Sequence, residues 1–298
     1  MTDARHISVM AVEVADLLNL KAGAIAVDGT LGLGGHAIQM CERVGPKGRL
    51  IGIDQDDKAV AIAREHLKQA PCPVDIVRNN FQHIDTVLDG LGVPAVDGIL
   101  LDIGVSSIQL DDPERGFSFR TEGPLDMRMD QHAEVSAATL VNSLSEEELA
   151  AIIWKYGEER FSRRIAGSIV RTRALRPITT TKDLADLVLR ALPNGYQRGQ
   201  IHPATRTFQA LRIAVNKELE VLEAALDKAF ARLKIGGRLV VIAFHSLEDR
   251  IVKEKFRGLG RLGCAALVVK KPLRPGDAES EQNPRSRSAR LRAIERIA

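Results

Sequence analysis

The chain has 298 residues, of which 45% are hydrophobic and 27% charged, a composition typical of a globular protein with about two domains. Its apolar runs are shorter than a membrane-spanning helix, and its first residues (MTDARHISVM) lack the apolar core of a secretory signal. The three cysteines, Cys41, Cys72 and Cys264, are scattered, which argues against disulfides and a clustered metal site. We therefore expect a cytoplasmic protein with no membrane partner and no bound metal.

The net charge of +3 is distributed unevenly. Residues 160–217 carry a net charge of +10 and residues 250–298 carry +8, so the remainder carries −15. Two basic stretches on an acidic body favour a polyanionic partner such as nucleic acid. Solvated helix faces would explain the same charges without any partner.

The first third of the chain alternates short apolar runs with helical segments. A helix is expected over 56–69, where acidic residues begin an amphipathic stretch. Strands are expected over 24–28, 49–54, 74–79 and 96–105. Apolar strands separated by helices are typical of a parallel sheet covered on both faces. The pattern predicts a doubly wound, Rossmann-like α/β fold.

The pattern changes after residue 111. Residues 112–211 contain no convincing strand and include helical segments at 145–175 and 180–192. A long amphipathic helix (207–233) then leads to a fifth strand (236–244). Near the end, 266–271 and the segment SARLRAIERI are expected to form an antiparallel edge hairpin. We predict a core formed by 1–111 and 212–298, interrupted by a helical insertion over 112–211.

A glycine-rich segment, DGTLGLGGH, follows the first strand at residues 28–36. Gly32, Gly34 and Gly35 allow close backbone approach to a ligand, and the helix that follows offers unpaired N–H groups. Asp54 ends the second strand, where a carboxylate can accept hydrogen bonds from ribose hydroxyls. Gly32, Gly34 and Ala37 also satisfy the dinucleotide pattern G-x-G-x-x-A, which has false positives.

Three further residues favour S-adenosylmethionine over a dinucleotide. Asp28 would repel a pyrophosphate but attract the ammonium group of a methionine moiety. Phe81 follows the third strand, where an adenine could stack on it, although core packing explains a lone phenylalanine equally well. Asp102 ends the fourth strand and adds a carboxylate beside a cationic ligand.

In chain order, several segments resemble the ribosomal small-subunit RNA cytosine-N4 methyltransferase family. They are HISVM (6–10), DGTLGLGGH (28–36), GIDQD (52–56), LLDIGVSSIQLDDPERGFSF (100–119), LDMRMD (125–130), RTFQALRIAVN (206–216), FHSLEDRIVK (244–253) and NPRSRSARLR (283–292). The resemblance spans nearly the whole chain. It implies a class I methyltransferase sheet whose helical insertion, 112–211, contributes to recognition of the substrate RNA. It also implies methylation of a cytidine amine in the decoding region of 16S rRNA, naked or in the small subunit. The cofactor contacts it implies are Gly34, Gly35, His36, Asp54, Phe81, Asp102 and Gln109.

Transfer of a methyl group from a sulfonium to an amine is a direct displacement that needs in-line positioning of the acceptor. A hydrogen-bond acceptor at the cytosine amine would localise its lone pair and take up developing charge. The candidates are side chains at the ends of strands four and five: Asp102, Ser106, Ser107, His245 and Ser246. His245 could also remove the proton, or it could simply cap the helix that follows.

The cysteine positions bear on the reaction type. Methylation of a cytosine ring carbon would require a covalent thiolate adduct, and Pro71-Cys72 superficially resembles such a site. Cys72, however, precedes the third strand and is expected at the wrong edge of the sheet. Cys41 falls in a helix and Cys264 in a late loop. These positions favour transfer to nitrogen.

Arginines dominate the two basic stretches and suit bidentate phosphate contacts. They are Arg160, Arg163, Arg164, Arg171, Arg173, Arg176, Arg198 and Arg206 in the insertion, and Arg285, Arg287, Arg290 and Arg292 in the tail. With 4% aromatic residues, recognition would rest on phosphate contacts and shape, with the target base flipped out. The alternatives are a methyltransferase for proteins or small molecules, and an inactive cofactor-sensing RNA-binding protein. A homodimer is also compatible with the sequence.

Overall fold

The computed structural model describes residues 8–193, 196 and 202–298. Arg198, and His6 and Ile7 of the first resemblance segment, lie outside the described residues. The chain forms two compact units, Met1–Gly104 with Leu219–Ala298, and Val105–Glu218. The second unit therefore begins and ends seven residues outside the expected insertion of 112–211. Among the described residues, no helix has the length and apolar character needed to cross a membrane.

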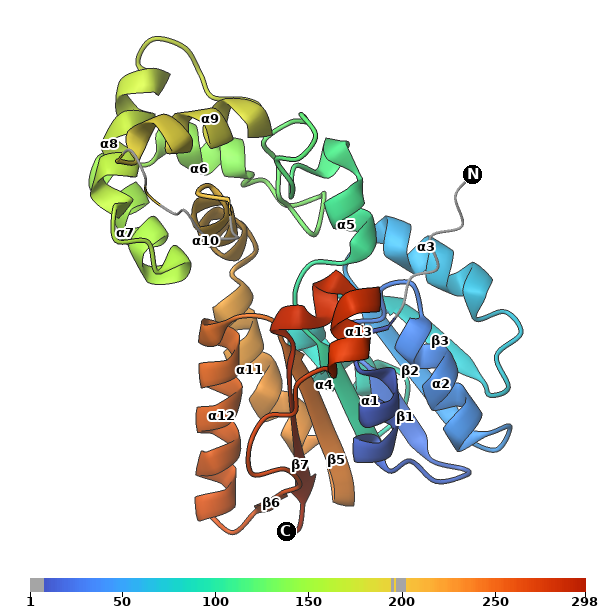
Figure 1. Ribbon diagram of the computed structural model, residues 1–298. Coiled ribbons are helices and arrows are strands. Elements are labelled where there is room, and N and C mark those ends of the chain that lie inside the picture. Colours follow the sequence, from blue (N-terminus) through green and yellow to red (C-terminus); the bar gives the residue numbers. More distant parts are fainter. Residues whose placement is uncertain (1–7, 194–195, 197–201) are drawn as a thin grey trace. The chain divides into compact units, whose positions relative to one another are not determined.

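The first unit is built on a seven-stranded sheet with the order β3-β2-β1-β4-β5-β7-β6 (Figure 1). The first five strands are parallel, and β7 is antiparallel to both β5 and β6. This topology confirms the predicted Rossmann-like methyltransferase fold and the antiparallel edge hairpin. The strands are β1 (Ile25–Asp28), β2 (Arg49–Asp54), β3 (Val74–Arg78), β4 (Val96–Asp102), β5 (Leu233–Ala243), β6 (Ala265–Leu267) and β7 (Arg290–Arg296).

The strand expected over 266–271 is shorter than predicted. β6 ends at Leu267, although Val268 still donates a backbone hydrogen bond to Ala293. Two lysines and Pro272 follow, and proline has no N–H to continue a ladder. Pairing resumes only at Leu273, which forms an isolated bridge with Leu291.

Helices cover both faces of the sheet, as the apolar strands predicted. One core cluster packs buried side chains of α1, α2 and α3 against the sheet, and another uses α4, α11 and α12. These helices are α1 (Ala11–Leu18), α2 (Gly35–Val44), α3 (Asp57–His66), α4 (Ile84–Gly90), α11 (Glu218–Ala231) and α12 (Ser246–Arg261). A short α13 (Asp277–Gln282) and two 3-10 turns, η1 (Phe81–His83) and η3 (Pro284–Ser288), complete the unit.

The second unit is helical, and its own core is separate from those of the sheet. Side chains such as Leu149, Ile153 and Leu184 fill that core. Arg115 is also buried in this unit, and its guanidinium group donates to the carbonyls of Arg128 and Met129 at 2.9 and 3.0 Å. Its elements are α5 (Ser107–Asp111), η2 (Pro113–Arg115), α6 (Ala137–Ser143), α7 (Glu146–Gly157), α8 (Ser162–Arg173), α9 (Thr181–Ala191) and α10 (Thr205–Asn216).

The single long helix expected over 207–233 is wrong. The chain forms α10, then turns at Lys217, whose φ of 50° is left-handed, and starts again as α11. The Asn216 side chain holds the break, because it donates to Met127 O and accepts from Met129 N, both at 2.8 Å. The left-handed backbone conformation costs about 1 kcal/mol for a residue other than glycine. The tertiary contacts of Asn216 offset this cost at Lys217. Similarly, 145–175 forms two helices that turn at Glu158, whose φ is also 50°.

Candidate cofactor and substrate site

Three aspartates lie at one edge of the sheet. Asp28, Asp54 and Asp102 are the last residues of β1, β2 and β4, and the register aligns Asp28 with Gly52 and Leu100 on the neighbouring strands. Carboxyl ends of parallel strands are where ligands bind in such sheets. The structure therefore brings together the carboxylates that the sequence placed at a cofactor site.

The glycine-rich turn ties these strand ends together. Thr30 Oγ1 accepts a 2.7 Å hydrogen bond from the Asp102 backbone N–H, and the Gly32 N–H donates to Asp54 Oδ2 at 2.8 Å. Gly32 and Gly34 have φ values of 51° and 85°, and Gly34 precedes the first residue of α2. A left-handed backbone of this kind is unstrained only for glycine. The turn is thus a preformed backbone cradle at the start of a helix.

A histidine and a carboxylate lie close together beside the cradle. His36 Nε2 on α2 is 3.6 Å from Asp102 Oδ2, and the His36 side chain is 8% exposed. Burial alone would lower the pKa of His36, but Asp102, Asp28 and Glu279 together raise it. Asp102 Oδ1 and His36 Nε2 are buried, and neither makes a hydrogen bond within the described part of the chain. Such polar atoms are costly unless a ligand satisfies them.

Burial also perturbs two of the aspartates. It raises the pKa of Asp28 to about 6, partly opposed by the charge of His36. It raises the pKa of Asp54 to about 6 as well, against the backbone N–H donors of Asp56 and Gly32. A cation bound beside these carboxyl groups would favour their ionised forms.

The affinity for S-adenosylmethionine should therefore rise as the pH rises from 5 to 7, because Asp28 and Asp54 must lose their protons. One coupled carboxyl group changes the affinity by about tenfold per pH unit below its pKa. The raised folded-state pKa values also mean that the unliganded protein loses stability as the pH rises through about 6. Titration calorimetry from pH 5 to 7 tests the first expectation, and an affinity independent of pH would contradict it.

Phe81, the predicted adenine contact, begins the 3-10 turn η1 after β3. Asn80 caps this turn by accepting from Gln82 N at 3.0 Å, and its amide donates to Gln55 Oε1 at 2.8 Å. The Phe81 side chain is half-buried against the core under α4, α11 and α12. Core packing, the alternative considered for this residue, accounts for part of its surface, and stacking on a base stays a prediction.

Ser106, Ser107 and Gln109 belong to the second unit. Ser106 caps α5 in a reciprocal arrangement with Gln109: its hydroxyl accepts from Gln109 N at 3.3 Å, and its N–H donates to Gln109 Oε1 at 3.1 Å. Ser107 is the first residue of that helix, and the Gln109 side chain is buried. These contacts give Ser106 and Gln109 a structural role, and their contact with a substrate or cofactor stays a prediction.

His245 performs the capping role that was its alternative. Its Nδ1 accepts from Glu248 N at 3.3 Å at the start of α12, while Nε2 lies 3.0 Å from Glu248 Oε1. Glu248 Oε2 in turn accepts from the Phe244 and His245 backbone. Nδ1 is therefore used by the Glu248 backbone, while Nε2 lies beside the Glu248 carboxylate without a hydrogen bond within the described part of the chain. The capping role ties the ring to α12, and a role as proton acceptor stays a prediction. Ser246 is the first residue of α12.

The tail arginines are divided between structural and exposed positions. Arg290 and Arg292 both bind Asp249 on α12, with donor–acceptor distances of 3.1 and 2.7 Å, and these contacts lower the pKa of Asp249 against its burial. Arg285 and Arg287 are exposed. The tail therefore offers less charge to a polyanion than its sequence suggests.

In the helical unit, several arginines also make internal contacts. Arg176 forms an exposed pair with Asp183 at 2.7 Å, and Arg206 donates to Glu158 O. Arg173 donates to Val141 O, and Arg160 lies over the rings of Phe161 and Tyr196. Arg163, Arg164 and Arg171 are exposed on α8.

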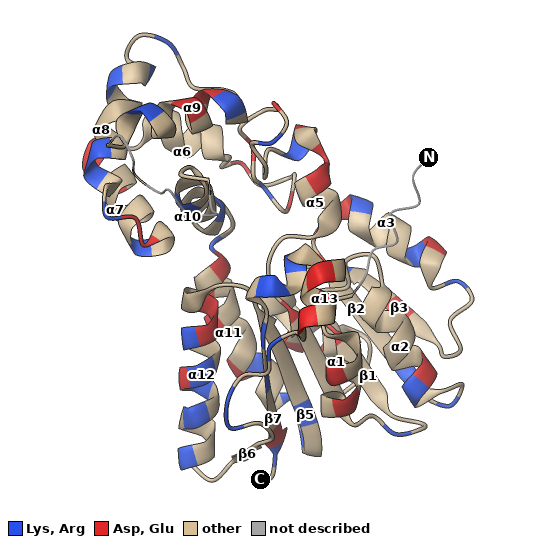
Figure 2. Cartoon of the chain, viewed as in Figure 1, with Lys and Arg blue, Asp and Glu red and all other residues tan. Residues whose placement is uncertain are grey.

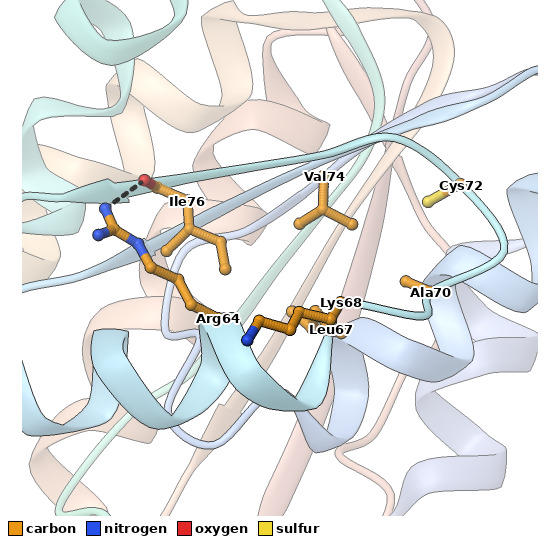
Figure 3. Close-up of a pocket in the computed structure, with 7 residues that line it drawn as sticks. All are labelled: Arg64, Leu67, Lys68, Ala70, Cys72, Val74 and Ile76. Carbon is orange, nitrogen blue, oxygen red and sulfur yellow. Dashed lines mark hydrogen bonds between the residues drawn. The ribbon is translucent and has the colours of Figure 1, made fainter.

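The cysteines lie away from the strand tips. Cys72 precedes β3 and lines a hollow beside α3 with Leu67, Val74 and Ile76, where no predicted site residue lies (Figure 3). Burial raises the pKa of Cys72 and of Cys41, so both thiols stay protonated at neutral pH. Cys264 precedes β6, whose first residue pairs with Arg296. The Arg296 side chain donates to Leu233 O at the beginning of β5, the end of the strand away from the site. These positions agree with the expectation that no cysteine reaches the site.

Two residues of the site were missed from the sequence. Thr30 joins the turn to β4, and Glu279 of α13 accepts from Met10 N at 2.7 Å while its charge raises the pKa of His36. Thr30 lies within the glycine-rich segment, and a hydroxyl at the end of a strand is a local signal for a hydrogen bond to the neighbouring strand of the sheet. Glu279 is 243 positions from His36, and nothing in its local pattern indicates the contact.

Comparison with known proteins identifies the relatives of this chain. Residues 3–297 match the MraW methylase family. A protein called ribosomal RNA small subunit methyltransferase H from Geotalea uraniireducens is 53% identical over all of both chains. One with the same name from Lachnospira eligens is 48% identical over 98% of each chain. The family match confirms the predicted methyltransferase reaction and its cofactor, S-adenosylmethionine.

Proposed function

Because the chain belongs to the MraW methylase family, we propose that it methylates the exocyclic N4 amine of a cytidine in the decoding region of 16S rRNA. The relatives named above carry the small-subunit rRNA methyltransferase name, which supports this substrate. The observation that carries the chemistry is the acidic strand edge of Asp28, Asp54 and Asp102 beneath the glycine cradle. We propose that the protein acts in the cytoplasm, on naked rRNA or the small subunit, and that it works as a monomer or a homodimer.

The residues at this edge fit S-adenosylmethionine, which supplies an electrophilic methyl group when bound. Gly32 and Gly34 adopt the left-handed backbone of the turn, and the first turn of α2 offers backbone N–H donors. Asp54 has lone pairs beyond those used by Gly32 and Asp56 and would accept from the ribose hydroxyls. The buried Asp102 Oδ1 and His36 Nε2 await polar partners. Asp28 and Asp102 would stabilise positive charge, while Phe81 would lie against the adenine, and Gln109 would complete the set.

Asp102 is the best acceptor for the target amine. Its Oδ2 lies 3.6 Å from His36 Nε2, its backbone N–H donates to Thr30, and its Oδ1 makes no hydrogen bond within the described part of the chain. A fixed carboxylate oxygen at the amine N–H would localise the nitrogen lone pair and take up charge as the bond forms. His245 caps α12, so we assign it and Ser246 to shaping the strand-five tip. Ser106 and Ser107 would contact the target nucleotide.

Transfer to nitrogen predicts that the cysteines are dispensable. Cys41→Ala, Cys72→Ala and Cys264→Ala together should leave turnover close to that of the wild type, because no thiol lies at the strand tips. Removing two buried thiols should lower Tm by about a few degrees. Turnover is measured on protein shown to be folded by circular dichroism. Loss of turnover in a folded variant would indicate a covalent route to a ring carbon.

The proposed product can be tested with purified protein. Small subunits that lack the modification are incubated with the protein and S-adenosylmethionine, and the rRNA is digested to nucleosides for mass spectrometry. N4-methylcytidine is the expected product, and it separates chromatographically from its isomer 5-methylcytidine. Formation of 5-methylcytidine would overturn the nitrogen assignment, and transfer only to ribosomal protein would overturn the RNA substrate.

A further inference from the structure

The outer surface of α12 is strongly basic. The helix buries Leu247, Val252 and Phe256 against the sheet. Figure 2 shows basic residues along its length. Four basic residues follow one another at spacings of three or four, which places them on one face, opposite the core: Arg250, Lys253, Arg257 and Arg261. We call these four residues the basic face.

The acidic residues of α12 neutralise only part of the basic face. Glu248 and Asp249 are 0% and 8% exposed, and they bind His245 and the arginines of β7 instead. Within α12, all of whose residues are described, Glu254 is the single exposed acidic residue. Lys255, which points elsewhere on the helix, is paired with Asp227 of α11.

The arrangement works against the stability of the helix. Like charges three or four residues apart repel one another on a helix surface. Lys253, Arg257 and Arg261 follow one another with the same sign, and Glu254, four residues after Arg250 and three before Arg257, is the one opposite charge among them. A polyanion lying along the face would offset this repulsion and gain from releasing its own counterions.

The position of α12 indicates which polyanion fits. The helix begins directly after β5, whose Ile242 is aligned with Asp102 on β4, so its first turn starts at the edge where the target base is proposed to bind. From Arg250 to Arg261 the basic face then extends about 17 Å, with one basic group per turn of about 5.4 Å. An RNA strand leaving the site would meet a row of cations interrupted only by Glu254.

We propose that the basic face of α12 binds the phosphate backbone of the substrate RNA next to the target cytidine. This inference rests on the proposed function and adds the surface that holds the flanking strand. It also relocates the contact expected of the tail, because Arg290 and Arg292 are bound to Asp249.

The test compares two triple variants with the same loss of charge. Lys253→Gln, Arg257→Gln and Arg261→Gln together remove the basic face but leave Arg250, which has a partner within the protein. The control, Lys21→Gln, Arg43→Gln and Lys47→Gln, removes three exposed cations near the beginnings of β1 and β2, at the opposite edge of the sheet. Binding of a small-subunit rRNA fragment is measured at several salt concentrations.

The slope of log affinity against log salt should flatten by about 2 in the α12 variant, since each phosphate contact contributes about 0.7. The control should keep the wild-type slope, and S-adenosylmethionine should bind both variants as it binds the wild type. KM for RNA should rise in the α12 variant with kcat little changed. A slope shared by both variants would overturn the inference, as would RNA binding that is unchanged while binding to phosphatidylserine vesicles or self-association is lost. Wild-type protein that neither binds nor methylates the rRNA would instead overturn the proposed function.

Discussion

Asp102→Asn should lower kcat for rRNA methylation by about 10²- to 10⁴-fold, the range expected when a positioned acceptor is lost. The amide keeps the size of the side chain and leaves the backbone bond to Thr30 intact. It removes the negative charge that the target amine requires and the partner of His36. Single-turnover kinetics with saturating cofactor measure the effect on the chemical step.

Asp97→Asn is a matched control, because Asp97 lies on the same strand at its other end, where it binds Ile25 N and Lys234. This control should keep its turnover. Cofactor affinity is measured for both variants, since Asp102 also borders the cofactor site. An Asp102→Asn enzyme with weakened cofactor binding but wild-type kcat would assign the carboxylate to the cofactor alone.

Asp54→Asn should weaken S-adenosylmethionine binding by about ten- to a hundredfold, corresponding to the loss of roughly 1.5–3 kcal/mol from hydrogen bonds to a charged acceptor. Asparagine retains one oxygen, which can still accept from Gly32, while its NH2 group loses the hydrogen bond that Asp54 Oδ1 accepts from Asp56 N. The alanine variant would remove the bond from Gly32 as well and confound the result. Isothermal titration calorimetry measures the affinity, with circular dichroism to verify the fold.

S-adenosylhomocysteine separates two explanations of the Asp54 effect. It has the same ribose but lacks the sulfonium charge, so a ribose contact predicts equal losses for both ligands. A larger loss for S-adenosylmethionine would mean that Asp54 acts through its charge. Asp57→Asn serves as the control. Asp57 is exposed, lies three residues after Asp54 and pairs with Arg78, so this variant should bind both ligands normally. Unchanged binding by Asp54→Asn would remove Asp54 from the site.

The sheet and its acidic edge could be predicted from sequence because their signals are local. Each buried strand is an apolar run, and β1, β2 and β4 each end in an aspartate that the run itself marks. The break between α10 and α11 has no such signal, since Lys217 is neither glycine nor proline and the turn depends on contacts of Asn216 with residues 127 and 129. Hydrophobic periodicity continues through it unchanged.

The remaining differences come from partners that are distant in sequence. Arg290 and Arg292 looked available to RNA, because nothing near them indicates that Asp249 lies across the sheet edge. Glu279 lies in the C-terminal part of the chain, and its charge acts on the pKa of His36 only because the folded chain brings the two residues near each other. The sequence left two roles open for His245, proton transfer and helix capping. In the structure it caps α12, where Glu248 is only three residues away. The charge of the two basic stretches therefore indicated a polyanionic partner, but it could not indicate which arginines are available to bind one.

The central claim is methylation of a cytidine amine in the decoding region of 16S rRNA. Its most direct test is mass-spectrometric mapping of that rRNA from cells with the gene deleted, and from the same cells complemented with wild-type protein or with Asp102→Asn. We expect one N4-methylcytidine in the decoding region to disappear on deletion, to return with the wild type and to stay absent with Asp102→Asn. An unchanged set of rRNA modifications in the deletion strain, or loss of a methyl group only from a ring carbon or a ribose, would contradict the account.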